Sequence, residues 1–315
     1  MRIRSFLFFS AVLLTSFSFQ SKAQQGADDL AKMLEQEDKT AKHKKDYTTA
    51  TFKATRILDG NSIENTGKGV LDFRIMHRFG ELSTGASNFY GFDNAATKLA
   101  LDYGITKWLM VGVGRSAYLK EYDAFTKVKI LRQVKNGGMP LSLSYATGAT
   151  LQGEDVQLAP DGSKYSVVDR MRFYHQILIA RKFNDWLSLQ LMPTLIHMNV
   201  VDSSKDANDI MAMGIGGRIK LSTRFALTGE YYYTLGNKLS GHDYQNGLSV
   251  GVDIETGGHV FQLVFTNATG LNEHSFVAQN TSKWSNGGIH FGFNISRVFT
   301  IVQPEEFKHT NNKSW

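Results

Sequence analysis

Residues 99–114 constrain the fold most, because apolar residues alternate there with small or polar ones along two short runs. The first run reads LALDYGI and the second reads WLMVGVG. A period of two is typical of a β-strand whose two faces differ. Only Thr106 and Lys107 separate the runs, and a two-residue connection between strands predicts a tight β-hairpin.

The same unit recurs along the chain and predicts about twelve strands. The connections alternate in length, a pattern typical of transmembrane barrels, which have short turns on the periplasmic side and longer loops outside. The pattern predicts an all-β chain, a single antiparallel up-and-down transmembrane β-barrel. The expected strands cover residues 70–79, 99–105, 108–114, 122–133, 141–151, 171–181, 186–198, 210–221, 224–235, 248–256, 259–266 and 289–301.

Strand length and aromatic placement favour lipid as the surroundings of this barrel. Most of the runs reach the 9–11 residues that a tilted strand needs to cross a bilayer. Aromatic residues follow several short turns, at Trp108, Trp186, Phe225 and Phe261, and they predict a girdle at one membrane interface. Alternation alone also fits the alternative, a water-soluble barrel or sandwich with its apolar faces inward.

The N-terminus has the features of a cleaved secretory signal peptide over residues 1–23. Arg2 and Arg4 precede an apolar run, and small residues follow near Ala23, as a signal peptidase site requires. A membrane anchor is the weaker alternative because the run is short for a span. We expect a polar periplasmic arm over residues 24–50, either a short helix or a disordered leader, then the barrel over 51–302 and a polar tail over 303–315. Residues 51–58 are left over as an extra strand, inside the barrel or at its rim.

Composition excludes several classes of function. Without Arg2, Arg4 and Lys22 the 35 basic residues fall to 32 against 29 acidic ones, too small an excess to predict nucleic-acid binding. The chain has no cysteine, so disulfides, thiolate metal sites and a lipoprotein anchor are excluded. No cofactor or metal site is expected.

Three segments resemble a known group of proteins: TFKATR at residues 51–56, GVLDFRIMHRFG at 69–80 and LDYGITKWLMVGVGRS at 101–116. The chain resembles a family of uncharacterised bacterial outer-membrane-type β-barrel proteins, a domain of unknown function, from about residue 51 to 301. The resemblance implies a barrel in the outer membrane of a Gram-negative cell, with lipid and the barrel-assembly machinery as partners. Such barrels commonly end on an aromatic residue that this machinery reads, and the candidates here are Phe299, near the end of the last strand, and Trp315, at the end of the polar tail. The resemblance supplies no ligand or catalytic residue.

Two motifs with catalytic or cofactor spacing do not fit their sequence context. Ser249 lies in GLSVG, the G-x-S-x-G pattern of hydrolases, but that serine needs a sharp strand-to-helix turn and here the strand pattern continues. The G-x-G-x-x-A spacing at Gly112 should open a helix, and a strand follows instead. His175 and His197 fall on mainly apolar faces, so we interpret them as interfacial residues. A membrane-embedded hydrolase remains the less favoured alternative.

The polar faces of the strands are the best functional signal. Ionisable groups at membrane depth are tolerated when they face water or are paired. The favoured function is therefore a channel for small solutes or ions, not an enzyme. The alternatives are a salt-bridged, plugged interior and a scaffold barrel whose N-terminal arm binds a periplasmic protein. The candidate lumen-lining residues are Asp72, Arg74, Arg78, Lys98, Asp102, Lys127, Lys129, Arg172, Gln190, Arg218, Glu230 and Asp253.

Overall fold

The computed structural model describes residues 45–153, 159, 162–201, 203–236, 238–256 and 258–303. The expected signal peptide, the arm up to residue 44 and the tail after residue 303 lie outside these ranges. The chain divides into two compact units, Met1–Tyr47 and Thr48–Trp315, and the barrel belongs to the second. Its strands are β1 (Val70–Glu81), β2 (Ala95–Gly104), β3 (Leu109–Ser116), β4 (Tyr122–Leu131), β5 (Ser142–Leu151), β6 (Met171–Lys182), β7 (Leu187–Met198), β8 (Asp209–Lys220), β9 (Phe225–Leu235), β10 (Gly247–Thr256), β11 (His259–Thr266) and β12 (His290–Thr300).

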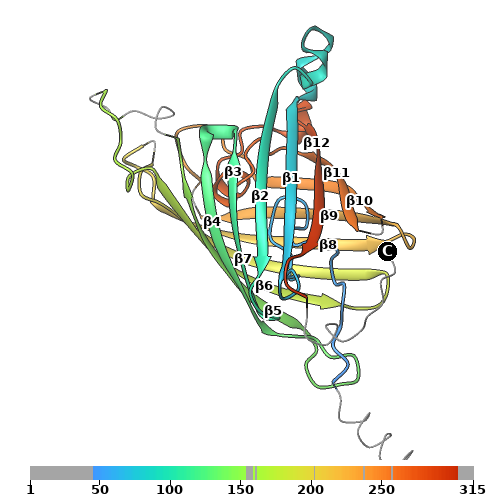
Figure 1. Ribbon diagram of the computed structural model, residues 1–315. Coiled ribbons are helices and arrows are strands. Elements are labelled where there is room, and N and C mark those ends of the chain that lie inside the picture. The colour runs from blue at the N-terminus through green and yellow to red at the C-terminus, as the bar shows by residue number, and fades with distance from the viewer. Residues whose placement is uncertain are drawn as a thin grey trace, which may run out of the picture. The chain divides into compact units, whose positions relative to one another are not determined.

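All twelve strands pair with their neighbours in sequence, and β1 pairs with β12 to close the barrel (Figure 1). The closing register runs from Val70 opposite Thr300 to Glu81 opposite His290, with one irregularity after Arg78. Every pairing is antiparallel. The predicted architecture of about twelve up-and-down strands is therefore confirmed.

The observed strands differ from the expected ones mainly at their ends. The strand expected from residue 99 begins at Ala95, where it pairs with Phe79 of β1. The first four residues of β2, at positions 95–98, are small or polar, so apolar alternation does not reveal them in the sequence. Main-chain pairing extends the strand because a ladder hydrogen bond does not depend on side-chain type.

The apolar faces point outward and the polar faces point inward. On β7 the side chain of Leu189 is 39% exposed, whereas its neighbour Gln190 is 1% exposed. Successive residues of a strand face opposite sides, so this pair fixes the orientation of the wall. The alternative of a soluble barrel with an apolar interior is wrong. Among the described residues, no helix is both long and apolar enough to cross a membrane.

Short helices occur only in the connections of the described chain. Between β1 and β2 lie η1 (Leu82–Thr84) and η2 (Ala86–Gly91), and η3 (Tyr118–Lys120) follows β3. The connection between β11 and β12 carries α2 (Glu273–Ala278) and η4 (Trp284–Asn286). All six residues of α2 are buried, so this connection folds back onto the protein.

Candidate functional site

The candidate site is the lumen of the barrel, and the structure places the predicted lumen residues there. Of the twelve candidates, Lys129 keeps a side chain that is 13% exposed, and the others are buried. Burial at every second position follows from the strand period. In this structure these side chains contact protein groups, so the lumen is filled as the plugged alternative expects.

Residues 51–66, which we call the inner segment, fill much of the lumen. All of them except Lys53, Glu64 and Asn65 are buried. The leftover stretch at residues 51–58 is therefore not a barrel strand. It belongs to a short hairpin in which Arg56 bridges Asn61. Two main-chain hydrogen bonds hold this hairpin, from Ile57 N to Gly60 O at 2.8 Å and from Ser62 N to Thr55 O at 3.0 Å.

The tip of the hairpin is held by charged and polar groups of the wall. The Asp59 carboxylate contacts Arg78 Nη2 at 2.7 Å and accepts a hydrogen bond from Ser249 Oγ at 2.6 Å. The main-chain N–H groups of Asp59 and Gly60 donate to the Glu230 carboxylate. Each of these groups is buried, and buried charges are stable when they are paired and hydrogen-bonded.

Other wall charges pair with one another or with the open end of the inner segment. Arg74 Nη2 lies 2.7 Å from Asp102 Oδ2, and Arg218 contacts both Asp253 and Glu255. Lys98 Nζ lies 3.0 Å from Asp123. The structure thus joins Asp72 and Asp102 through Arg74 and pairs Arg218 with Asp253, and it does not gather all the predicted residues into one cluster. Glu64 and Lys53 of the inner segment reach Lys129 and Glu255, respectively.

Residues 267–289, which we call the inward loop, enter the lumen from the end opposite to the inner segment. Glu273 of α2 accepts hydrogen bonds from Arg56 Nη1 and from Asn61 Nδ2, the latter at 3.1 Å. Both partners belong to the inner segment, so the two inserts contact each other inside the barrel. His274 Nε2 lies 2.9 Å from Glu121 Oε1, which fixes the loop to the connection between β3 and β4.

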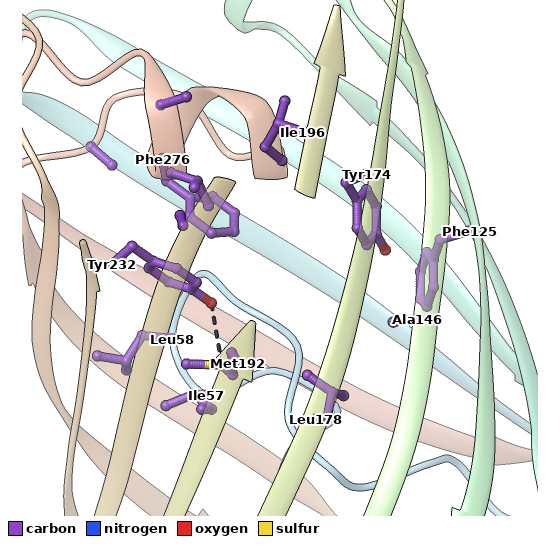
Figure 2. Close-up of a cluster of buried hydrophobic side chains, with 14 of the residues drawn as sticks. Ile57, Leu58, Phe125, Ala146, Tyr174, Leu178, Met192, Ile196, Tyr232 and Phe276 are labelled. Atoms are coloured by element: carbon purple, nitrogen blue, oxygen red, sulfur yellow. Dashed lines mark hydrogen bonds between the residues drawn. The ribbon is translucent and has the colours of Figure 1, made fainter. Parts of the chain in front are cut away.

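An apolar cluster packs around the tip of the hairpin. Figure 2 shows Ile57 and Leu58 close to Met192 of β7 and Tyr232 of β9, with Phe276 of α2 above them. The Tyr232 hydroxyl donates to Met192 Sδ at 3.3 Å. The inner segment, the wall and the inward loop therefore share one hydrophobic core, which lies beside the polar and charged groups of the lumen.

Residues 52–299 match the family described as a membrane-bound beta barrel domain (DUF5777). The chain belongs to this family. The outward apolar surface of this membrane-bound barrel is therefore its lipid-facing surface, and the expected aromatic girdle should lie on it. Trp108, Trp186 and Phe225 are exposed there beside the short turns. No curated protein sequence matches the chain.

Several solved porins and channels have a similar backbone. The NanC porin is 9% identical, with a TM-score of 0.44, over 72% of this chain and 98% of its own. The KdgM porin is 8% identical, with a TM-score of 0.43, over 73% and 99%. An outer membrane channel from Pseudomonas putida F1 is 10% identical, with a TM-score of 0.48, over 75% and 97%.

The described residues do not form the hydrolase arrangement that the alternative requires. Ser249 Oγ contacts Asp59 and Thr266 Oγ1, the latter at 2.7 Å, and no histidine of the described chain contacts it. A second serine, Ser275, lies 3.1 Å from His274 Nε2. Glu121 contacts the same nitrogen, so the ring cannot pass a proton from serine to carboxylate as a triad does.

No described group of three or more His, Cys, Asp or Glu side chains is suited to hold a metal ion. His175 is hydrogen-bonded to Tyr145 and Thr147, and His197 to Asp209 and Asn199. These two histidines therefore have protein partners on the outer side of the wall.

Sequence reasoning missed several residues that organise the lumen: Asn61, Glu121, Gln262, Glu273 and Asn294. The last two strands do carry Gln262 and Asn294 at inward positions of the alternation, so the pattern could have included them. Glu273 lies in a loop with no periodicity, and no local signal distinguishes an inward-folded loop from an exposed one. Of the inner segment, only residues 51–58 were detectable, as an extra stretch left over after twelve strands were assigned.

Proposed function

We propose that the protein is a channel for small solutes or ions in the outer membrane of a Gram-negative cell, held closed by the inner segment. One observation carries this proposal: among the described residues, the inner segment pairs with no barrel strand. Its main-chain hydrogen bonds to backbone run within its own hairpin, and β1 and β12 close the barrel without it. The segment can leave while the strand ladder stays intact.

The charged wall also supports a lumen that admits water when the segment leaves. Arg74 keeps Asp102 as a wall partner, and Arg218 keeps Asp253. Arg78 loses Asp59 but keeps the Asn294 side chain at 2.9 Å. Charged groups in contact with water are stable at membrane depth and select ions by charge. The emptied lumen therefore has the lining of a hydrated path.

The filled lumen favours a second candidate, a scaffold barrel that transports nothing. In that case residues 24–50 bind a periplasmic protein, and the inner segment permanently anchors this arm to the barrel. Outer-membrane lipid surrounds the wall under both proposals, and the barrel-assembly machinery inserts it. The two candidates differ in whether the inner segment ever leaves.

A disulfide lock tests the channel directly. The chain has no cysteine, so Asp59→Cys with Ser249→Cys introduces one pair, placed where the native side chains touch at 2.6 Å. In planar bilayers the reduced protein should conduct, because the contacts of Asp59 with Arg78 and Ser249 are lost. The oxidised protein should not conduct, because the disulfide holds the segment in place. Ser249→Cys alone, which leaves Asp59 intact, is the matched control, and its conductance should be the same with and without the reductant.

Two results would contradict the channel. The first is equal conductance of the oxidised and reduced double variant. The second is zero conductance of a variant lacking residues 48–66 that still migrates faster on gels when unheated, as a closed barrel does. The scaffold proposal instead expects that deletion of residues 24–45 abolishes capture of a periplasmic protein and leaves conductance unchanged.

A further inference from the structure

Side chains of the lumen wall form many hydrogen bonds to the main chain of the inner segment. Gln190 of β7 makes a two-point contact: its Oε1 accepts from Ile63 N, and its Nε2 donates to Asn61 O, both at 2.7 Å. Gln262 of β11 donates to Ile57 O at 2.6 Å, and Asn294 of β12 donates to Leu58 O at 2.8 Å. These acceptors and donors exist in every polypeptide, whatever its sequence.

A buried lysine and a buried glutamate complete this set. Lys127 Nζ of β4 donates to three carbonyl oxygens of the inner segment, those of Thr55, Ser62 and Glu64, at 3.2, 2.9 and 2.6 Å. Glu230 of β9 accepts from consecutive N–H groups at the hairpin tip. Five side chains from five strands therefore surround a single stretch of backbone.

The wall also provides room for particular side chains. A Cβ atom on Gly216 of β8 would lie 2.4 Å from Ile57 Cδ1, and one on Gly251 of β10 would lie 2.8 Å from Leu58 Cδ2. Glycine at these two places leaves the space that Ile57 and Leu58 occupy. Peptide-binding proteins combine the same two features, with main-chain hydrogen bonds for affinity and side-chain pockets for specificity.

From this arrangement we propose that the lumen is a peptide-binding site, and that short peptides able to turn as residues 51–66 do are a solute class of the channel. The proposal rests on the proposed function in one respect: the inner segment must leave before another peptide binds. The inner segment then acts as a tethered competitor, which its covalent attachment keeps at high effective concentration.

The wall contacts also have a simpler explanation: the buried N–H and C=O groups of the inner segment need hydrogen-bond partners. It does not require that the partners be side chains of the wall, because a longer hairpin or a helix would satisfy its own backbone. Here one hairpin makes only two internal main-chain bonds, and wall side chains supply most of the others. The wall groups that contact main chain do not distinguish the inner segment from another chain with the same backbone shape, whereas the spaces at Gly216 and Gly251 select its side chains.

The test uses the full chain with a loosened inner segment, Arg56→Ala with Asp59→Ala, which removes the contacts to Glu273 and Arg78 and leaves the five wall side chains intact. The probe is a fluorescent 16-residue peptide with the sequence of residues 51–66, and binding is followed by anisotropy. A second peptide carries an N-methyl group on the Ile63 nitrogen, which removes the donor to Gln190 and keeps every side chain. If the double variant does not fold, Asp59→Asn alone replaces it.

We expect the loosened protein to bind the probe and the unaltered protein to bind it far more weakly. N-methylation should weaken binding on the order of tenfold, as the loss of a buried hydrogen bond does. Gln190→Met in the loosened protein should weaken it similarly. Leu189→Met, a substitution on the outer face of the same strand, is the matched control and should change nothing.

Two results would overturn the peptide site: no binding by a loosened protein that conducts, or binding that N-methylation and Gln190→Met leave unchanged. The first leaves the channel standing with a different solute. Binding that responds to both changes in a protein that never conducts supports the peptide site and removes the channel. The two proposals therefore fail separately.

Discussion

Asp59→Ala is the substitution that most directly tests whether polar contacts hold the lumen closed. It leaves Arg78 buried without its carboxylate partner, while Arg78 keeps hydrogen bonds to Asn294 Oδ1 and His77 O, each at 2.9 Å. Removing one partner of a buried ion pair costs about 3–5 kcal/mol. Because these two hydrogen bonds remain, we expect the lower end of that range, about 3 kcal/mol.

This cost falls on the closed state alone, because water reaches Arg78 once the inner segment leaves. A free-energy change of about 3 kcal/mol corresponds to about a hundredfold change in an equilibrium constant. The ratio of open to closed lumen should therefore rise about a hundredfold. The free energy of barrel unfolding should change less, since the strand ladder does not include the segment.

The labelling rate of a single cysteine measures this ratio. Ala54 is buried in the inner segment, and Ala54→Cys introduces the sole thiol of the chain. When a site reacts only after opening, its rate follows the open population. Asp59→Ala should speed the reaction with a water-soluble maleimide about a hundredfold. Asp185→Ala is the control, because this carboxylate is fully exposed and contacts Lys182 at 3.8 Å. Equal rates in the two backgrounds would refute the reasoning.

Three further predictions concern the wall, the fit of the hairpin and the inward loop. Leu189→Arg should cost about 2–4 kcal/mol of stability in refolding from urea into lipid vesicles, and an unchanged midpoint would mean that Leu189 does not face lipid. Gly216→Val should displace Ile57, which lies 2.4 Å from the added Cβ, and should speed the labelling of Ala54→Cys; no increase would show that the hairpin does not need this space. Burial alone would raise the pKa values of Glu121 and Glu273, but pairing with His274 and Arg56, respectively, holds both below the ordinary 4.5. Because both pKa values are lowered by folding, the stabilisation of the loop is present above pH 4.5 and is lost as the pH falls further. A thiol introduced as Val277→Cys should then label faster below pH 4.5 than at pH 7 once each rate is divided by that of a free cysteine peptide at the same pH, because protonation of the thiol itself slows the reaction at low pH. A normalised rate that does not change with pH would exclude these pairs as the anchor.

The strands were predictable because their signal is local. Alternation with a period of two follows directly from strand geometry, and short turns such as Thr106–Lys107 mark where one strand ends and the next begins. The inward placement of Arg74, Asp102 and Gln190 came from the same period. Antiparallel neighbours in sequence are also neighbours in space, so the order of the strands required no long-range information.

The contents of the lumen were not predictable in the same way, because their contacts join distant parts of the chain. Arg56 and Glu273 are 217 residues apart, and Asp59 and Ser249 are 190 apart. An inward-facing charge has the same pattern in the sequence whether its partner is water or another side chain. The extra stretch at residues 51–58 was the one sign in the sequence that chain remained to fill the interior.

The polar character of the filling itself favours a lumen that empties. A permanent plug has no need of ions, since replacing buried ion pairs with packed apolar side chains is often neutral or stabilising. An apolar interior, however, would expel water when the plug left, and a hydrophobic constriction of this kind blocks conduction. Arg78 and Lys127 are satisfied by the inner segment in this structure, and in the open state that we propose water would satisfy them. A wall lined with such groups is stable in both states, which is what a channel with a removable plug requires.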